Sequence, residues 1–334
     1  MARSDFGGQA LLEGVLMRGR FALGVAMRHP DGSIVGAQEQ LDSILHRNRF
    51  ARAPFFRGLV VLYETLVVGT RWLMRSGSVQ AQADGAELGR GAMALTLLIT
   101  LVLAVGLFVL LPLFVAGATT SALANSQALV QHLLEGLIRV VVFVGYLLLV
   151  SRSAEIRRTF QYHGAEHMTI HALEHDDPLD VEHVRGYPTA HPRCGTEFLV
   201  IFIILSILMF SLLAGQSLVV AIVGRILLIP VIASLAYELL RIGARYRERW
   251  WIRWLFLPGI WLQSITTRQP EDSMIEVAIA SMQEALAANG ETAPSGSYDP
   301  PRRHLAEQAP TARLDPEPVT AAREADPASD QLVR

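Results

Sequence analysis

The sequence predicts a mainly α-helical, polytopic membrane protein with about four transmembrane helices, an N-terminal cytoplasmic segment and a disordered C-terminal tail. Two observations lead to this prediction. Hydrophobic residues make up 51% of the 334 residues and charged residues only 18%, which is unusual for a soluble domain. In addition, four apolar runs are predicted to enter a bilayer, whose hydrocarbon core takes about 20 apolar residues of helix. The runs are Ala92–Ala116, Leu137–Val150 (the membrane part of a longer helix with a polar start), Phe198–Ala214 and Ser217–Leu240.

Residues 1–91 form the predicted cytoplasmic or interfacial region. Phe21–Arg28 and Ser33–Glu39 flank a Pro-Asp-Gly sequence, and short extended segments around such a turn predict a β-hairpin. Residues 55–75 predict an apolar helix that could span a membrane, but the charged residues that interrupt it favour an interfacial or partly buried helix.

The predicted membrane domain covers residues 92–288 and includes a His-rich cytoplasmic loop at 153–197. Trp250–Leu262 is too short to span and is rich in Trp, which predicts an interfacial or re-entrant segment. Ser273–Ala288 has the pattern of a short amphipathic helix. Residues 289–334 are rich in Pro, Ala, Glu and Arg with little apolar content, which predicts a disordered tail.

The distribution of arginines predicts the orientation in the membrane. Eleven arginines precede the first apolar run, and none lies in the 118–138 connection. Further arginines lie in the 153–197 loop and directly after the fourth run. Because basic residues are retained on the cytoplasmic side, both termini and the His-rich loop are predicted to be cytoplasmic, in a bacterial inner membrane. The formal net charge of −2 argues against nucleic acid as a partner.

The densest group of reactive side chains follows the second apolar run, in the sequence YHGAEHMTIHALE. His163, Glu166 and His167 form an H-x-x-E-H pattern, which is typical of two zinc-binding histidines one helical turn apart with a Glu as general base. On a helix, His171 and Glu174 fall on the same side as the two histidines. The alternative is the solvated face of an amphipathic helix, where polar residues recur at the same spacing.

A third ligand has to come from another part of the chain, and several residues qualify. Glu174 shares the helix face, but three turns carry it more than about 10 Å from His163 along the axis. We therefore rank His191 and Glu238 first, ahead of Cys194. Cys194 has two other interpretations: a thiolate of low pKa favoured by nearby cations, or a small, partly buried residue.

Two further charged residues are candidates for binding roles. Arg193 would suit an anionic head group or phosphate, or would simply anchor the loop on the cytoplasmic side. Glu13 lies in an apolar stretch, where a carboxylate needs a partner, and Arg18 or a His of the central helix would serve. The alternative for Glu13 is an exposed position on an amphipathic turn.

Four blocks of sequence together resemble the YqhQ-like family of bacterial membrane proteins, a family of unknown function. The resemblance covers about residues 5–285, and it implies the same order of blocks and membrane segments together with the family's expected role as a metal-dependent enzyme. The blocks are GGQALLEGVLMRG at 7–19, YHGAEHMTIHALE at 162–174, HPRCGTEFL at 191–199 and PGIWLQSITTRQPEDSMIEVAI at 258–279.

Two classes of function are consistent with these features. The first is a membrane-embedded, metal-dependent hydrolase with its site at the cytoplasmic interface and a lipid-linked or membrane-protein substrate. Its cofactor would be a divalent metal, Zn²⁺ before others, because imidazoles bind it well. The second is a non-enzymatic membrane protein, namely a metal-binding sensor, an assembly scaffold or a transporter, although four spans without repeats disfavour a transporter. The oligomeric state stays open.

Overall fold

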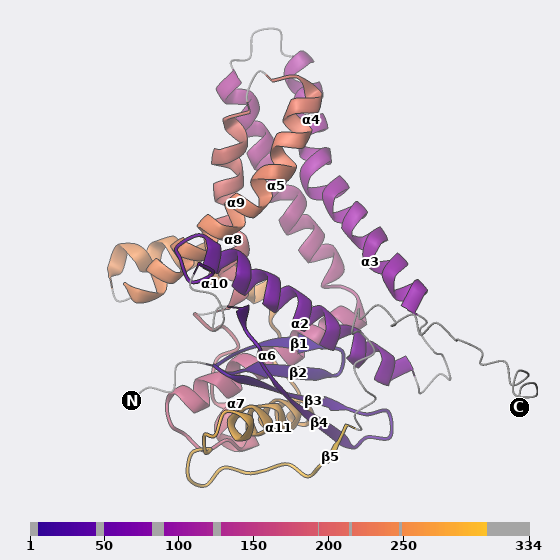
Figure 1. Ribbon diagram of the computed structural model, residues 1–334, viewed down its shortest axis with the longest axis vertical. Helices are drawn as coiled ribbons and strands as arrows, with labels where there is room; N and C mark the ends of the chain where they lie inside the picture. Colours follow the sequence, from indigo (N-terminus) through magenta and orange to yellow (C-terminus); the bar gives the residue numbers. More distant parts are fainter. Residues whose placement is uncertain are drawn as a thin grey trace, which may run out of the picture. The chain divides into compact units, whose positions relative to one another are not determined.

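The structure, a computed structural model, describes residues 6–44, 50–81, 90–122, 128–192, 194–213, 216–246 and 249–305. Met1–His304 form one compact unit and Leu305–Arg334 a second. The first unit is mainly helical and carries a small β-sheet, as the sequence predicts (Figure 1).

The sheet has five strands in the order β1-β2-β3-β4-β5. The first four, β1 (Gly7–Leu11), β2 (Gly14–Arg18), β3 (Ala22–Arg28) and β4 (Ile34–Gln40), pair antiparallel with their neighbours. The predicted hairpin is confirmed as β3 and β4. The structure adds β1 and β2, which the sequence analysis had not identified as strands. Their apolar side chains are almost fully buried, so this region has its own core.

Helices α11 (Asp272–Ala288) and α6 (Ala154–Glu174) make most of the helix contacts with the sheet. Helix α11 packs mainly on β3, and α6 packs on β1 and on α11. Gly24 in β3 allows this close approach, because a Cβ there would lie 2.1 Å from the backbone nitrogen of Ala285. The sequence analysis had included these residues in the predicted membrane domain, and the structure shows them packed on the sheet. The helix is buried almost all round by the sheet and α6, where a purely amphipathic pattern predicts one exposed face.

The boundary predicted for the disordered tail is also wrong. Residues 289–305 are ordered against the sheet, and β5 (Arg302–His304) pairs in parallel with β4. The Asn289 side chain accepts hydrogen bonds from the backbone N–H groups of Phe21 and Ala22, and Arg302 forms an ion pair with Glu284. Apolar content could not predict that this segment is ordered, because main-chain hydrogen bonds and ion pairs hold it against the sheet. The rest of the predicted tail lies outside the described residues.

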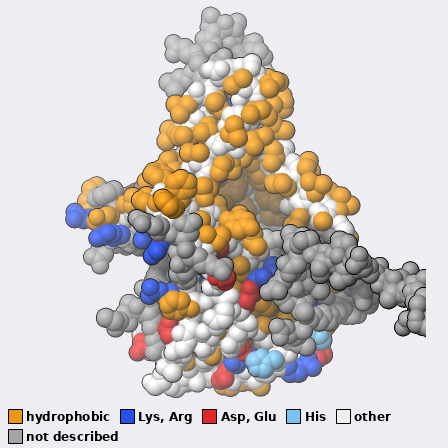
Figure 2. Space-filling model, viewed as in Figure 1, with side chains coloured by type: hydrophobic (Ala, Val, Ile, Leu, Met, Phe, Trp, Pro, Cys, Tyr) orange, Lys and Arg blue, Asp and Glu red, His pale blue; other side chains and the backbone are white. Residues whose placement is uncertain are grey.

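Within the described residues, two helical stretches are long and apolar enough to cross a membrane. The first, Ala94–Ala118, combines α3 (Arg90–Val105), the π-helical turn η2 (Gly106–Leu110) and α4 (Leu111–Ala122); the second is Leu218–Gly243 within α9 (Leu218–Arg245). They match the first and fourth predicted spans. Figure 2 shows hydrophobic side chains gathered over these helices.

The other two predicted spans take shorter forms. Helix α5 (Ala128–Val150) meets α6 at a bend of 99°, and the pair passes as a third span only if it counts as one broken helix. Since α6 packs on the sheet, α5 is the apolar part of this broken helix. Helix α8 (Gly195–Ser211) is apolar but has only 17 residues. The structure therefore contains two or three candidate spans.

Buried charges link the apolar helices. Glu135 of α5 accepts hydrogen bonds at 2.8 Å from Arg139 and from Arg225 of α9, and each of these side chains is at most 6% exposed. On the sheet side, α2 (Phe56–Ala81) packs on α9. Helix α10 (Trp250–Thr266) contacts α8 and leaves Trp250, Trp254 and Trp261 exposed.

Candidate metal centre

Helix α6 carries the predicted histidines on one side and packs into the core with the other. His163, His167 and His171 recur every fourth residue, so their side chains follow one face of the helix. The helix lies directly against the segment that follows α10. At Gly164, a Cβ would come within 2.1 Å of the carbonyl oxygen of Arg268. The glycine of the H-x-x-E-H pattern thus sets the distance between α6 and this segment.

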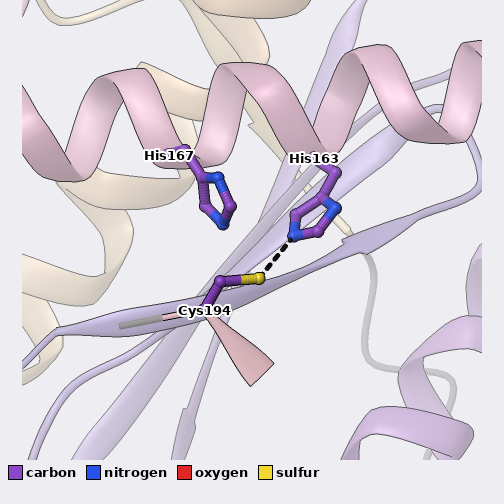
Figure 3. Close-up of side chains that lie close together, drawn as sticks. All are labelled: His163, His167 and Cys194. Carbon is purple, nitrogen blue, oxygen red and sulfur yellow. Dashed lines mark hydrogen bonds between the residues drawn. The ribbon is translucent and has the colours of Figure 1, made fainter. Parts of the chain in front are cut away.

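The first donor group consists of His163, His167 and Cys194, whose ligand atoms all lie within 4.8 Å of one another. Figure 3 shows both rings projecting from α6 toward the cysteine at the start of α8, and Cys194 Sγ lies 3.3 Å from His163 Nε2. Tetrahedral zinc, with Zn–S of about 2.3 Å and Zn–N of about 2.0–2.1 Å, places a sulfur and a nitrogen ligand about 3.5 Å apart. The observed separation is close to that value.

Hydrogen bonds fix which nitrogen of each ring is available. His163 Nδ1 donates to the carbonyl oxygen of Thr266 at 2.9 Å, and His167 Nδ1 donates to that of Thr189 at 2.6 Å. A carbonyl can only accept, so each Nδ1 carries the proton and each neutral ring keeps its lone pair on Nε2. Metal-ligating histidines are oriented by this kind of hydrogen bond. The sequence analysis did not identify these two threonines, and only the block at 258–279 had drawn attention to Thr266.

Glu166 lies on the side of α6 that faces β1. It is 3% exposed and accepts a hydrogen bond from the backbone N–H of Gly8, and its Oε2 has no hydrogen-bond partner among the described residues. Burial raises its pKa to about 8, against a smaller lowering by His163. A buried carboxyl oxygen without a partner is costly, so this atom needs a ligand, a water or a cation nearby.

Burial also governs the titration of the neighbouring groups. It lowers the pKa of His167 well below the ordinary value and lowers the pKa of His171 as well, so both rings are neutral near pH 7. Burial raises the pKa of the Cys194 thiol more than the Thr196 hydrogen bonds lower it. The interpretation of Cys194 as a thiolate of low pKa is therefore wrong for the protein alone, because the thiol is buried against the helices and away from solvent.

The second donor group consists of His171, Glu174 and His191, again with ligand atoms within 4.8 Å of one another. His191 Nε2 lies 3.4 Å from Glu174 Oε2, and the His171 and His191 rings are 4.5 Å apart between centroids. Gln263, fully buried, accepts from the backbone N–H of His191 and donates to its carbonyl oxygen. These two hydrogen bonds hold the main chain of His191 in the position from which its side chain reaches Glu174.

The ranking of third ligands for the first pair is thus corrected. Cys194, which the sequence analysis ranked below His191 and Glu238, is the residue that joins His163 and His167. Glu238 lies elsewhere: its carboxylate accepts from the Arg57 side chain and from the backbone N–H of Phe55. It could not reach the histidines because α9 directs it toward the start of α2.

Glu13 has a partner on α6, as a carboxylate in an apolar stretch requires. Both of its oxygens accept from Arg158 at 2.6 Å, and the Tyr162 hydroxyl donates to it at 3.2 Å. The prediction that Arg18 or a histidine would be this partner is wrong, because the Arg18 side chain donates a hydrogen bond to Glu64 of α2. Arg193, the other charged candidate, lies outside the described residues.

The comparisons with known proteins give the chain its family. Residues 53–288 match the family described as "Protein of unknown function (DUF1385)". The chain belongs to this family. It is also 31% identical over 294 residues to "Uncharacterized protein YqhQ" of Bacillus subtilis (strain 168), which covers 84% of this chain and 92% of that protein. The resemblance to the YqhQ-like family is confirmed. No solved structure matches the DUF1385 chain.

Proposed function

We propose that this protein binds one divalent metal ion, Zn²⁺ before others, through His163, His167 and Cys194, and that it acts as a metal-dependent hydrolase beside the membrane. The observation that carries the proposal is the convergence of these donors, with both Nδ1 atoms held by carbonyl oxygens and His163 Nε2 directed at Cys194 Sγ. Such an arrangement costs burial of polar groups and is typical of an ion site.

The donor set fits Zn²⁺. Neutral imidazoles and a cysteine sulfur are ligands that zinc prefers, and three protein ligands leave one tetrahedral position for another molecule. An ion held there would polarise a carbonyl or phosphoryl group, or a water, at that position. Zinc binding would also displace the proton of the Cys194 thiol, which the buried protein alone retains.

Glu166 is the residue proposed to accept a proton from the attacking water. One of its oxygens is oriented by the Gly8 N–H, and the unpartnered Oε2 is free to take the proton. A carboxyl with a pKa of about 8 is largely protonated near pH 7. The positive charge of an ion at the adjacent donors would lower that pKa, so the base role depends on the bound ion.

We further propose four transmembrane helices, with α5 and α8 as the second and third, and both termini in the cytoplasm. The arginine distribution supports this orientation, and the bend between α5 and α6 supports a position of the α6 donors close to the membrane. The substrate would then be lipid-linked or a membrane protein. Reporter fusions at Ser121 and Gly186 test the topology: an exported signal at Ser121 and a cytoplasmic one at Gly186 support it, and the reverse contradicts it.

The test of the enzyme uses full-length protein in detergent and two variants. His163→Ala should lose zinc, while Glu166→Gln should keep stoichiometric zinc and lose hydrolysis of ester, phosphodiester and peptide probes. The matched control is Glu155→Gln, an exposed glutamate on the same helix, which should behave as wild type. Wild-type protein that carries no stoichiometric metal and takes none up near neutral pH would contradict the site.

A second function is favoured by burial. His167 is 2% exposed and Cys194 is 6% exposed, and closed sites of this kind in proteins are often structural. A non-enzymatic metalloprotein, such as a sensor or scaffold, would use the ion to hold α6 against α8. Chelation distinguishes the two: a large drop in melting temperature without any wild-type hydrolysis supports the structural role, and loss of hydrolysis from a folded protein supports the enzyme.

A further inference from the structure

A second group of metal donors lies one to two turns further along α6. We infer that His171, Glu174 and His191 bind a second divalent ion, separate from the one proposed at Cys194. The three ligand atoms lie within 4.8 Å of one another, which is also true of the first group. The inference depends on this geometry and does not require that the protein is a hydrolase.

The key distance agrees with metal coordination. Two ligands at about 2.0–2.1 Å from a tetrahedral ion lie about 3.4 Å apart. His191 Nε2 and Glu174 Oε2 are 3.4 Å apart. That separation is long for a charge-assisted hydrogen bond, which is about 2.7–2.9 Å.

The neighbouring residues hold the donors in place. His171 Nε2 donates to the carbonyl oxygen of Ala190 at 3.0 Å, so its lone pair is on Nδ1. Tyr187 stacks on the His171 ring, with 5.8 Å between centroids and 4° between planes. Gln263 fixes the main chain of His191 through two hydrogen bonds. Each histidine therefore has a support outside the donor group, as metal ligands usually have.

The two ions would not form a bridged pair. The two groups share no residue that could bridge two ions, and their nearest members on the helix, His167 and His171, are one turn apart, about 6 Å along the axis. Bridged metal ions are about 3.5–4 Å apart. The His167 and His191 rings, one from each group, are 5.6 Å apart. Two separate mononuclear sites along one helix face fit these distances.

The two sites differ in chemistry and in access. The second has two imidazoles and a carboxylate and no sulfur, so it suits Zn²⁺, Fe²⁺ or Co²⁺ and lacks the preference for soft ions that Cys194 gives the first. It is also nearer to solvent, because His171 is half-buried and the Glu174 side chain is 16% exposed. A small oxygen-containing molecule could reach its remaining coordination positions more easily than those of the first site.

Cobalt substitution of the full-length protein separates the two sites. Co²⁺ bound to Cys194 gives a thiolate-to-cobalt charge-transfer band in the near ultraviolet, and Co²⁺ bound to nitrogen and oxygen gives only weak visible bands. Metal analysis of wild-type protein titrated with Co²⁺ or Zn²⁺ should give two equivalents per chain. Glu174→Gln and His171→Ala should each give one equivalent with the charge-transfer band intact, and Cys194→Ser should lose the band and keep the second equivalent.

Two variants at exposed residues serve as matched controls. Glu182→Gln and His175→Ala change exposed residues near α6 and should keep two equivalents, and near-isosteric Glu174→Gln guards against misfolding. Binding of one equivalent by wild type and by Glu174→Gln alike, with the band present, would overturn the second site and leave the proposed function standing. One equivalent without the band, lost in Glu174→Gln, would instead overturn the first site.

Discussion

Gly164→Ala changes no metal donor, yet it should weaken metal binding. A Cβ at this position would lie 2.1 Å from the carbonyl oxygen of Arg268, and the gap must open by more than about 1 Å before ordinary van der Waals contact is reached. Two residues before Arg268, Thr266 accepts the hydrogen bond of His163 Nδ1. Metal ligands tolerate shifts of about 0.2 Å, so the displacement should remove the histidine from its position.

The expected size of the effect follows from two opposed terms. An Ala inside a helix stabilises by about 0.5–1 kcal/mol relative to Gly, whereas overpacking costs about 1–3 kcal/mol. We expect a net loss of about 1 kcal/mol in stability and a zinc affinity about 10–100-fold weaker, the range typical of lost outer contacts.

The assay is zinc affinity by competition with a chelator, together with thermal melting in detergent. Gly195→Ala is the matched control: it lies next to Cys194, a Cβ there meets nothing within 4 Å, and it should keep the wild-type affinity. Wild-type affinity and melting temperature in Gly164→Ala would refute the reasoning, because α6 would then not be held at this contact.

Two other substitutions test the charges around the centre. Glu13→Gln should lower the free energy of unfolding by about 1 kcal/mol at pH 7. Because the Arg158 hydrogen bonds hold the pKa of Glu13 below 4.5, the stability that Glu13 contributes is present above pH 4.5 and is lost as the pH falls through the lower pKa of the folded state. A difference in stability between wild type and variant that persists in acid would contradict this. Glu135→Gln should cost about 3–5 kcal/mol, because it leaves Arg139 and Arg225 buried without a carboxylate; a melting temperature equal to that of wild type would show that the pair is not needed.

Local sequence patterns were sufficient for part of the fold. The hairpin of β3 and β4 follows from turn residues between extended segments, and the apolar helices around Ala94–Ala118 and Leu218–Gly243 follow from composition alone. The strand β5 could not be predicted in this way, because it pairs through its main chain with β4, which is distant in sequence.

Local sequence patterns also predicted part of the candidate site. The H-x-x-E-H spacing placed His163 and His167 on one helix face, which the structure has. The third donor depended on the path of the chain between α6 and α8, which no local pattern specifies. In the structure, Gln263 holds the main chain of His191, which lies beside Glu174, and the chain between α6 and α8 brings Cys194 to His163. Sequence separation alone could not distinguish these two outcomes.

The measurement closest to the central claim is zinc K-edge X-ray absorption on the purified full-length protein. The account predicts a sulfur neighbour at about 2.3 Å together with nitrogen or oxygen neighbours at about 2.0–2.1 Å. The sulfur should disappear in Cys194→Ser. A zinc spectrum of wild-type protein with nitrogen and oxygen neighbours only, unchanged in Cys194→Ser, would contradict the assignment of His163, His167 and Cys194 as one metal centre.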